Sequence, residues 1–204
     1  MFDRPDPATA EALARLYDLD LRDDPGDLDL YLALADRADG PVLELCAGAG
    51  HIGLLAVARS GRQLVCVDAN PVACDFARAN AVDAGMADRV EVREGRLETA
   101  LAPDEQFPVV IADPPWVQSD QTSQFPEDPL AAIDGGADGL DVARACLSVI
   151  AAHLAPGGSA VLQLGTQAQA DVLRGEPCFT DGRLVLAEVR QEERGVLVRL
   201  DRGH

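Results

Sequence analysis

Short apolar segments alternate along this chain with longer segments in which apolar residues recur every three or four positions. The short segments are rich in Val, Leu and Ile, as expected of buried strands. They lie at 42–46, 64–67, 90–92, 109–112, 160–164, 184–189 and 196–200. The amphipathic segments predict helices at 50–60, 71–84, 139–154 and 167–174. This alternation predicts an α/β domain in which a mostly parallel sheet carries helices on both faces.

The last two predicted strands are joined differently from the others, because only residues 191–195 intervene. This connection has no room for a helix and predicts an antiparallel hairpin at one edge of the sheet. We therefore expect a seven-stranded, mostly parallel sheet with a C-terminal antiparallel hairpin. Two further helical patterns, at 8–17 and 28–38, lie in residues 1–40. We assign this N-terminal helical segment to the same domain as residues 41–204.

The chain is strongly acidic, with a net charge of −18 over 204 residues, and every basic residue apart from histidine is an arginine. An acidic surface disfavours a nucleic-acid partner, because proteins bind phosphate groups mainly through basic side chains. The sequence has no signal-peptide pattern, no apolar run of about 20 residues and no paired spacing among its five cysteines. These features predict a cytoplasmic protein with reduced cysteines, no membrane contact and no metal site.

A turn of small residues follows the first predicted strand. Glu44 lies in the strand, Ala47 and Gly48 form the turn, and Gly50 opens a helix. Small residues allow a tight turn and let a cofactor lie against the backbone, where a Cβ would block it. Asp68 ends the second strand, at a position that suits a carboxylate accepting ribose hydroxyls. Together these residues predict a site for a nucleotide-containing cofactor.

The fourth predicted strand ends in Asp113-Pro114-Pro115-Trp116. Ligands of parallel sheets bind at the carboxyl ends of the strands, so this loop should face the cofactor. Prolines fix φ and donate no hydrogen bond, which leaves carbonyl groups and the Asp113 carboxylate as acceptors. An amino or amide nitrogen with two N–H groups is the natural partner, and bonding both hydrogens would orient its lone pair. The Trp116 ring can stack on a planar substrate group.

Several segments together resemble known methyltransferases. Residues 44–50 resemble the (D/E)xGxGxG motif of class I S-adenosylmethionine (SAM) methyltransferases, with Ala47 in place of the first glycine, and residues 67–71 resemble their second motif. Residues 113–116 resemble the (N/D)PP(Y/F/W) motif of amino-group methyltransferases. Residues 132–141 resemble the "GG-DGLD" segment of the HemK-type protein-glutamine methyltransferases, and 154–158 their following "L-PGG".

This resemblance implies a Rossmann-like class I fold, SAM as cofactor, and methyl transfer to a nitrogen, most simply that of a protein glutamine side chain. The implied catalytic residues are Asp113, Pro114 and Trp116. The implied cofactor-binding residues are Glu44, Ala47, Gly48, Gly50, Asp68, Ala69, Arg96, Leu97 and Asp113. The compact members of the family also imply a small activating subunit.

Other acceptors stay open. Asp113 stands where the glutamine methyltransferases normally have Asn, and the N-terminal 40 residues resemble those of small-molecule methyltransferases. The alternatives are a small amine or amide, or a base amino group of rRNA, tRNA or DNA. A SAM-binding module without catalysis is a further alternative, although it would not need the Asp-Pro-Pro-Trp sequence. The long connection 117–134 is interpreted as a substrate lid.

Overall fold

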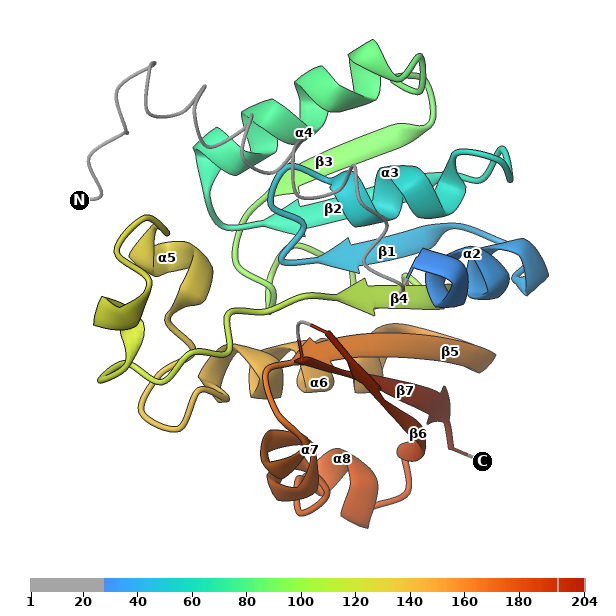
Figure 1. The fold of residues 1–204 in the computed structure, drawn as a ribbon. Helices are drawn as coiled ribbons and strands as arrows, with labels where there is room; N and C mark the ends of the chain where they lie inside the picture. Colours follow the sequence, from blue (N-terminus) through green and yellow to red (C-terminus); the bar gives the residue numbers. More distant parts are fainter. Residues whose placement is uncertain (1–27, 194, 204) are drawn as a thin grey trace.

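The computed structural model describes residues 28–193 and 195–203, and in this part of the chain it contains one seven-stranded sheet (Figure 1). The strand order is β3-β2-β1-β4-β5-β7-β6. Strands β1 to β5 pair in parallel, and β7 pairs antiparallel with both β5 and β6. The strands are β1 (Val42–Leu45), β2 (Leu64–Asp68), β3 (Val90–Glu94), β4 (Phe107–Ala112), β5 (Leu154–Leu164), β6 (Leu184–Glu192) and β7 (Gly195–Arg202). The predicted sheet and its C-terminal hairpin are confirmed.

Helices cover both faces of the sheet, as the alternation of segments predicts. They are α2 (Leu28–Arg37), α3 (His51–Val57), α4 (Pro71–Asp83), α5 (Leu130–Ile133), α6 (Asp141–His153), α7 (Gln167–Leu173) and α8 (Pro177–Thr180). Helices α2, α3 and α4 share one core cluster with Val42 and Leu64. Helices α6, α7 and α8 share the other cluster with Leu43 and Val65. Neighbouring residues of one strand thus enter opposite clusters, because side chains alternate across a sheet.

The start of β5 differs from the prediction by six residues, since the strand begins at Leu154 and not at position 160. The sequence Pro156-Gly157-Gly158 is typical of a turn. The structure instead carries it into the strand through an irregular pairing, in which the register shifts between Phe107 and Val109. Helix α6 accordingly ends at His153. The other predicted elements agree to within three residues at each end, and the helix predicted at 8–17 lies outside the described residues.

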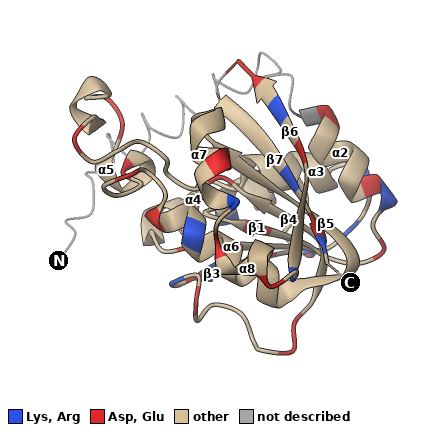
Figure 2. Cartoon of the chain, turned by 90° about the horizontal axis from the view of Figure 1, so that it is seen from below, with Lys and Arg blue, Asp and Glu red and all other residues tan. Residues whose placement is uncertain are grey.

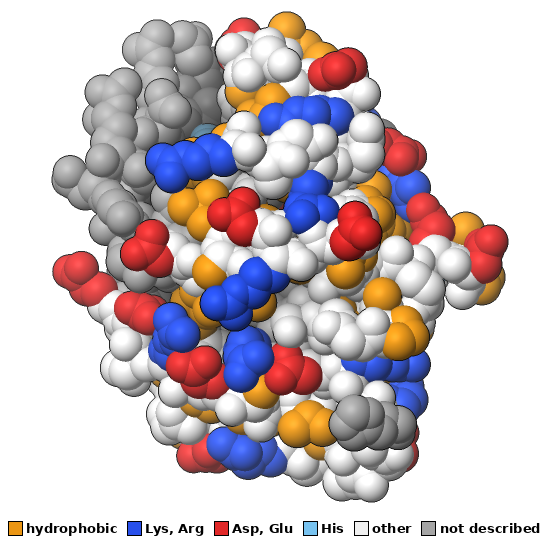
Figure 3. Space-filling view, turned by 90° about the vertical axis from the view of Figure 1, so that its right-hand side faces the viewer, with side chains coloured by type: hydrophobic (Ala, Val, Ile, Leu, Met, Phe, Trp, Pro, Cys, Tyr) orange, Lys and Arg blue, Asp and Glu red, His pale blue; other side chains and the backbone are white. Residues whose placement is uncertain are grey.

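Charged side chains are spread over the molecule. Arginines lie among acidic residues on helices, strands and connections (Figure 2). Figure 3 looks onto the end of the molecule where the parallel strands begin, and there too the basic and acidic side chains visible are intermixed. In these two views, acidic and basic residues are therefore interspersed. Within the described ranges, no helix is long and apolar enough to cross a membrane.

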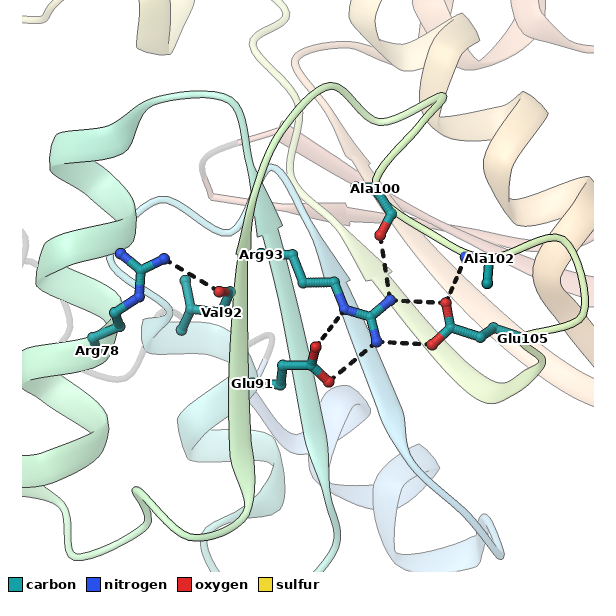
Figure 4. A network of polar contacts seen from close by, with 7 residues as sticks. All are labelled: Arg78, Glu91, Val92, Arg93, Ala100, Ala102 and Glu105. Atoms are coloured by element: carbon teal, nitrogen blue, oxygen red, sulfur yellow. Dashed lines mark hydrogen bonds and ion pairs between the residues drawn. The ribbon is translucent and has the colours of Figure 1, made fainter.

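The connection between β3 and β4, residues 95–106, contains no helix and is held by Arg93 of β3 (Figure 4). The Arg93 guanidinium donates to both carboxylate oxygens of Glu105, each at 2.8 Å, and to those of Glu91 at 2.9 and 3.1 Å. It also donates to the Ala100 carbonyl at 3.3 Å. These charged residues border a cavity of about 400 Å³ at the amino ends of the strands, away from the site predicted from the sequence.

Candidate active site

The three loops singled out by the sequence lie next to one another, because β2, β1 and β4 are adjacent parallel strands. Leu45 is in register with Val67 on one side and with Ala112 on the other. The residues that follow these three positions therefore leave the sheet at the same level. The predicted cofactor turn, the end of β2 and the Asp-Pro-Pro-Trp sequence thus meet at the carboxyl ends of the strands. Helix α5 projects from this end of the sheet, at the left of Figure 1.

Glu44 lies beneath the cofactor turn and is 3% exposed. One carboxylate oxygen accepts the Gly53 N–H at 3.0 Å, and the other accepts the Cys66 thiol at 3.3 Å. Burial raises the pKa of Glu44 from 4.5 to about 7, and these two hydrogen bonds oppose the shift. A Cβ at Gly53 would collide with this carboxylate. The Glu44 side chain therefore supports the start of α3 from inside the core, and its role in cofactor binding stays a prediction.

Asp68 joins the first two loops. Its carboxylate accepts the Gly48 N–H at 2.8 Å and the Asn70 N–H at 2.7 Å. Burial raises the pKa of Asp68, and the backbone N–H groups oppose the shift. Asn70 in turn caps α4 by accepting the Val72 N–H at 3.0 Å, while Ala69 between them is exposed. The second loop is thus rigidly attached to the cofactor turn.

The turn itself has left-handed backbone at Cys46, Gly48 and Gly50, with φ of 56°, 52° and 76°. Ala47 between them is buried. A Cβ placed on Gly48 would meet no atom of the described chain within 4 Å, whereas one on Gly50 would press against Ala77. Gly50 is therefore explained by packing. Gly48 borders open space beside Asp68, as a residue in contact with a ligand would.

Arg96 and Leu97 follow β3 and are attached to the site through Gly95, whose N–H donates to the Asp68 carbonyl at 2.9 Å. The Leu97 side chain packs against the core. The Arg96 side chain is 80% exposed and pairs with Glu98 at 3.4 Å. The segment therefore lies beside the predicted cofactor site, but only Leu97 turns its side chain inward.

The Asp-Pro-Pro-Trp loop lies directly beside the cofactor turn. The Asp113 N–H donates to the Leu45 carbonyl at 3.4 Å. The half-buried Asp113 carboxylate is near enough to Glu44 to help raise its pKa. Pro114 is buried, and Trp116 is half-buried. The structure therefore brings the three residues predicted to be catalytic into one loop at the site, with Asp113 nearest the cofactor turn.

Three glycines that the sequence interpretation did not include in the site allow this loop to pack closely. A Cβ at Gly135 would lie 2.6 Å from the Pro115 carbonyl oxygen, and one at Gly139 would collide with that of Trp116. A Cβ at Gly165, after β5, would collide with the Trp116 ring. The glycines of the "GG-DGLD" segment were the feature of the sequence that could have indicated this close packing, since glycine is typical where two backbones approach closely.

Residues 117–134 leave the loop and return to it. Val117 and Asp134 form an isolated bridge, and the Val117 N–H donates to the Ile133 carbonyl at 2.9 Å. Between these ends lie a short 3-10 helix (Thr122–Gln124) and α5, on which Leu130 is 62% exposed. The two ends of the segment are thus hydrogen-bonded to each other, and its role as a substrate lid stays a prediction. In the described part of the chain, no three His, Cys, Asp or Glu residues are grouped to hold a metal ion.

Comparisons with known proteins agree with this geometry. The chain is 33% identical over 128 residues to the ribosomal protein uL3 glutamine methyltransferase of Bordetella pertussis. The aligned region covers 60% of this chain and 43% of that protein. It is 36% identical over 134 residues to the release factor glutamine methyltransferase of Gloeobacter violaceus, covering 62% and 46%. The chain thus spans less than half the length of these curated relatives.

Solved structures show the same fold. A methyltransferase from Pyrococcus furiosus superposes with a TM-score of 0.66 at 16% identity, over 88% of this chain and 83% of that one. TrmN from Thermus thermophilus superposes with a TM-score of 0.63 at 20% identity, over 87% and 48%. The profile of the methyltransferase small domain matches residues 22–164, which include the cofactor turn and the Asp-Pro-Pro-Trp loop. The chain belongs to the methyltransferase small domain family and has the class I methyltransferase fold.

Proposed function

We propose that this chain is a SAM-dependent methyltransferase that modifies a nitrogen atom, with a protein glutamine side chain as the acceptor. The observation that carries the proposal is the open space over Gly48, bordered by Asp68 and by the loop of Asp113. Bound SAM would supply an electrophilic methyl group. The backbone of Ala47 and Gly48 would lie along the cofactor, and the Asp68 carboxylate would accept its ribose hydroxyls.

In this proposal the Asp113 carboxylate and the Pro114 carbonyl accept the two N–H groups of the acceptor amide. Hydrogen bonds to both hydrogens orient the nitrogen lone pair toward the methyl group, and the negative charge of Asp113 increases the electron density on that nitrogen. Trp116 provides an aromatic surface for the planar amide. The names of the two glutamine methyltransferases at 33% and 36% identity support this acceptor.

An exocyclic amino group is the second candidate acceptor, because Asp113 carries a charge where the glutamine methyltransferases have a neutral Asn. The net charge of −18 argues against a polymeric nucleic acid and leaves a small amine as the better form of this alternative. A small activating subunit and a cytoplasmic location stay predictions.

The cofactor part of the proposal is tested by placing a methyl group over Gly48. Gly48→Ala should weaken binding of S-adenosylhomocysteine at least tenfold, which is about 1.4 kcal/mol, because the new Cβ occupies the proposed cofactor space. Gly61→Ala is the matched control: Gly61 has a similar φ of 64° and equally open surroundings, but it precedes β2 at the other end of the strands. Calorimetric titration should find wild-type affinity in the control. Equal affinities in all three proteins would place the cofactor elsewhere.

The acceptor part is tested by transfer of a labelled methyl group to a glutamine-containing protein substrate. Asp113→Ala should abolish transfer and leave S-adenosylhomocysteine binding in place. Asp113→Asn should retain activity on glutamine, because the side-chain carbonyl still accepts an N–H. A fully inactive Asn variant that binds the cofactor normally would instead favour a small amine acceptor, for which the charge is needed.

A further inference from the structure

Gln169, in the first turn of α7, connects three separate segments through one side chain. Its Nε2 donates to the Trp116 carbonyl at 2.9 Å and, at 3.5 Å, to the Gly139 carbonyl. Its Oε1 accepts the N–H groups of Gly165 and Thr166 at 3.0 and 3.1 Å. The half-buried amide therefore joins the turn after β5 to the Asp-Pro-Pro-Trp loop.

The same turn also contacts the ring of Trp116. Gly165 lies so close beneath the indole that a Cβ there would collide with it. The side-chain amide of Gln169 accepts the backbone N–H of Gly165 and donates to the backbone carbonyl of Trp116. Both the ring and the main chain of Trp116 are thus fixed relative to one short segment. Without the Gln169 amide, the Trp116 carbonyl would lose this hydrogen bond. An unsatisfied carbonyl in a half-buried loop is unfavourable.

We infer that Gln169 is a positioning residue for methyl transfer: it fixes Trp116 and thereby sets how the acceptor nitrogen meets the Asp113–Trp116 loop. This inference rests on the proposed function, which it deepens. Residue 169 lies beyond the 22–164 range of the family match, and its role follows from the hydrogen bonds alone. An amide is required because the position needs an acceptor on one side and a donor on the other.

Gln169→Glu separates the acceptor function of this side chain from its donor function. The carboxylate keeps the acceptor for Gly165 and Thr166, and a Glu at this position of a capping box still supports the start of α7. The variant loses the donor and places a carboxylate oxygen next to the Trp116 carbonyl. Gln167→Glu is the matched control for charge, because Gln167 is exposed on the same helix turn and, among the described residues, its side chain bonds to Asp171 and not to Trp116. Thr166→Ala controls for the helix end, since it removes the other half of the capping box.

Fluorescence gives a readout that does not depend on activity, because Trp116 is the only tryptophan of the chain. Gln169→Glu should shift the emission to longer wavelength and increase quenching by acrylamide, as the ring loses its fixed contact. Gln167→Glu and Thr166→Ala should keep the wild-type emission. Gln169→Leu, which also frees the two N–H groups, should shift the emission at least as far. Unchanged emission in Gln169→Glu, or an equal change in Thr166→Ala, would overturn the inference.

Kinetics then separate positioning from a general loss of structure. Gln169→Glu should lower kcat/KM for the acceptor about tenfold or more, because a small displacement of the acceptor is costly, while S-adenosylhomocysteine affinity stays within about twofold. An unchanged kcat/KM, or an equal loss of cofactor affinity, would contradict a positioning role. If the wild-type protein transfers no methyl group but the emission changes as expected, the proposed function and the kinetic role fail, while the structural link from Gln169 to Trp116 stands.

Discussion

Glu44 shows how one residue of a cofactor motif can act from inside the core. In the residues that the structure describes, it is the one charged side chain among the buried positions. Its two partners, the Gly53 N–H and the Cys66 thiol, satisfy the carboxylate without removing the cost of burying a charge. These two contacts explain an acidic residue at this motif position by its support of the start of α3.

Glu44→Gln should change how stability depends on pH. Because the folded pKa is about 7 and the ordinary value 4.5, the unfolded chain releases this proton at lower pH than the folded protein does. The wild-type protein therefore loses stability as pH rises from 4.5 to about 7, by at most about 3 kcal/mol. Gln keeps the acceptor for Gly53 and has no such loss. Urea unfolding should show Glu44→Gln gaining on the wild type across this range, whereas the exposed control Glu127→Gln should not gain; a constant difference for Glu44→Gln would contradict the expectation.

At the scale of elements, the connection 95–106 shows an ion-pair network in the place where a helix could have covered the sheet. Arg93→Met should destabilise the protein by about 1–2 kcal/mol at neutral pH, because two carboxylates lose their partner at partly exposed sites. Arg93 holds the pKa of Glu105 at about 2, so this contribution is present above pH 4.5 and is lost as pH falls toward 2.

Thermal unfolding between neutral and acidic pH tests this assignment. The difference between the wild type and Arg93→Met should shrink as pH falls below 4.5. Arg78→Met is the control, because Arg78 joins α4 to the Val92 carbonyl and to the exposed Asp75 but not to Glu105. A difference for Arg93→Met that stays constant down to pH 3 would show that packing, and not the ion pair, holds the connection.

The sequence predicted these elements better than their contacts. Strand alternation identified all seven strands, because apolar side chains enter the core on both faces of the sheet. The same alternation places Glu44 on the side of Val42, beneath α3, whereas its predicted role in cofactor binding rests on the resemblance to a cofactor motif and stays a prediction. The start of β5 was missed because a Pro-Gly-Gly sequence in a strand depends on pairing with β4. The hydrogen bonds of Gln169 to Gly139 and Trp116 could not be recognised, since these two partners lie 30 and 53 residues away.

At the scale of the whole molecule, the charge of −18 opposes compactness. Acidic residues lie on helices, strands and connections (Figure 2). Several of them are exposed, such as Asp120 and Glu127 of the 117–134 segment. Residues 113–143, which carry the proposed acceptor loop, contain seven acidic residues and no arginine or lysine. Repulsion among such charges acts over the Debye length, so it depends on ionic strength more than hydrophobic packing does.

Added salt should therefore stabilise the protein at neutral pH. Raising NaCl from about 0.01 M to about 0.15 M shortens the Debye length from about 30 Å to about 8 Å, which screens repulsion across the molecule. A gain of about 1 kcal/mol would raise Tm by about 2–4 °C for a chain of this size. Tetramethylammonium chloride at equal ionic strength separates screening from binding of a specific cation: equal shifts in the two salts support screening. A Tm that stays constant or falls would mean that existing ion pairs already balance the acidic surface and that salt weakens them instead. The pairs concerned are those of Arg93 with Glu105 and of Arg144 on α6 with Asp138 and Glu176.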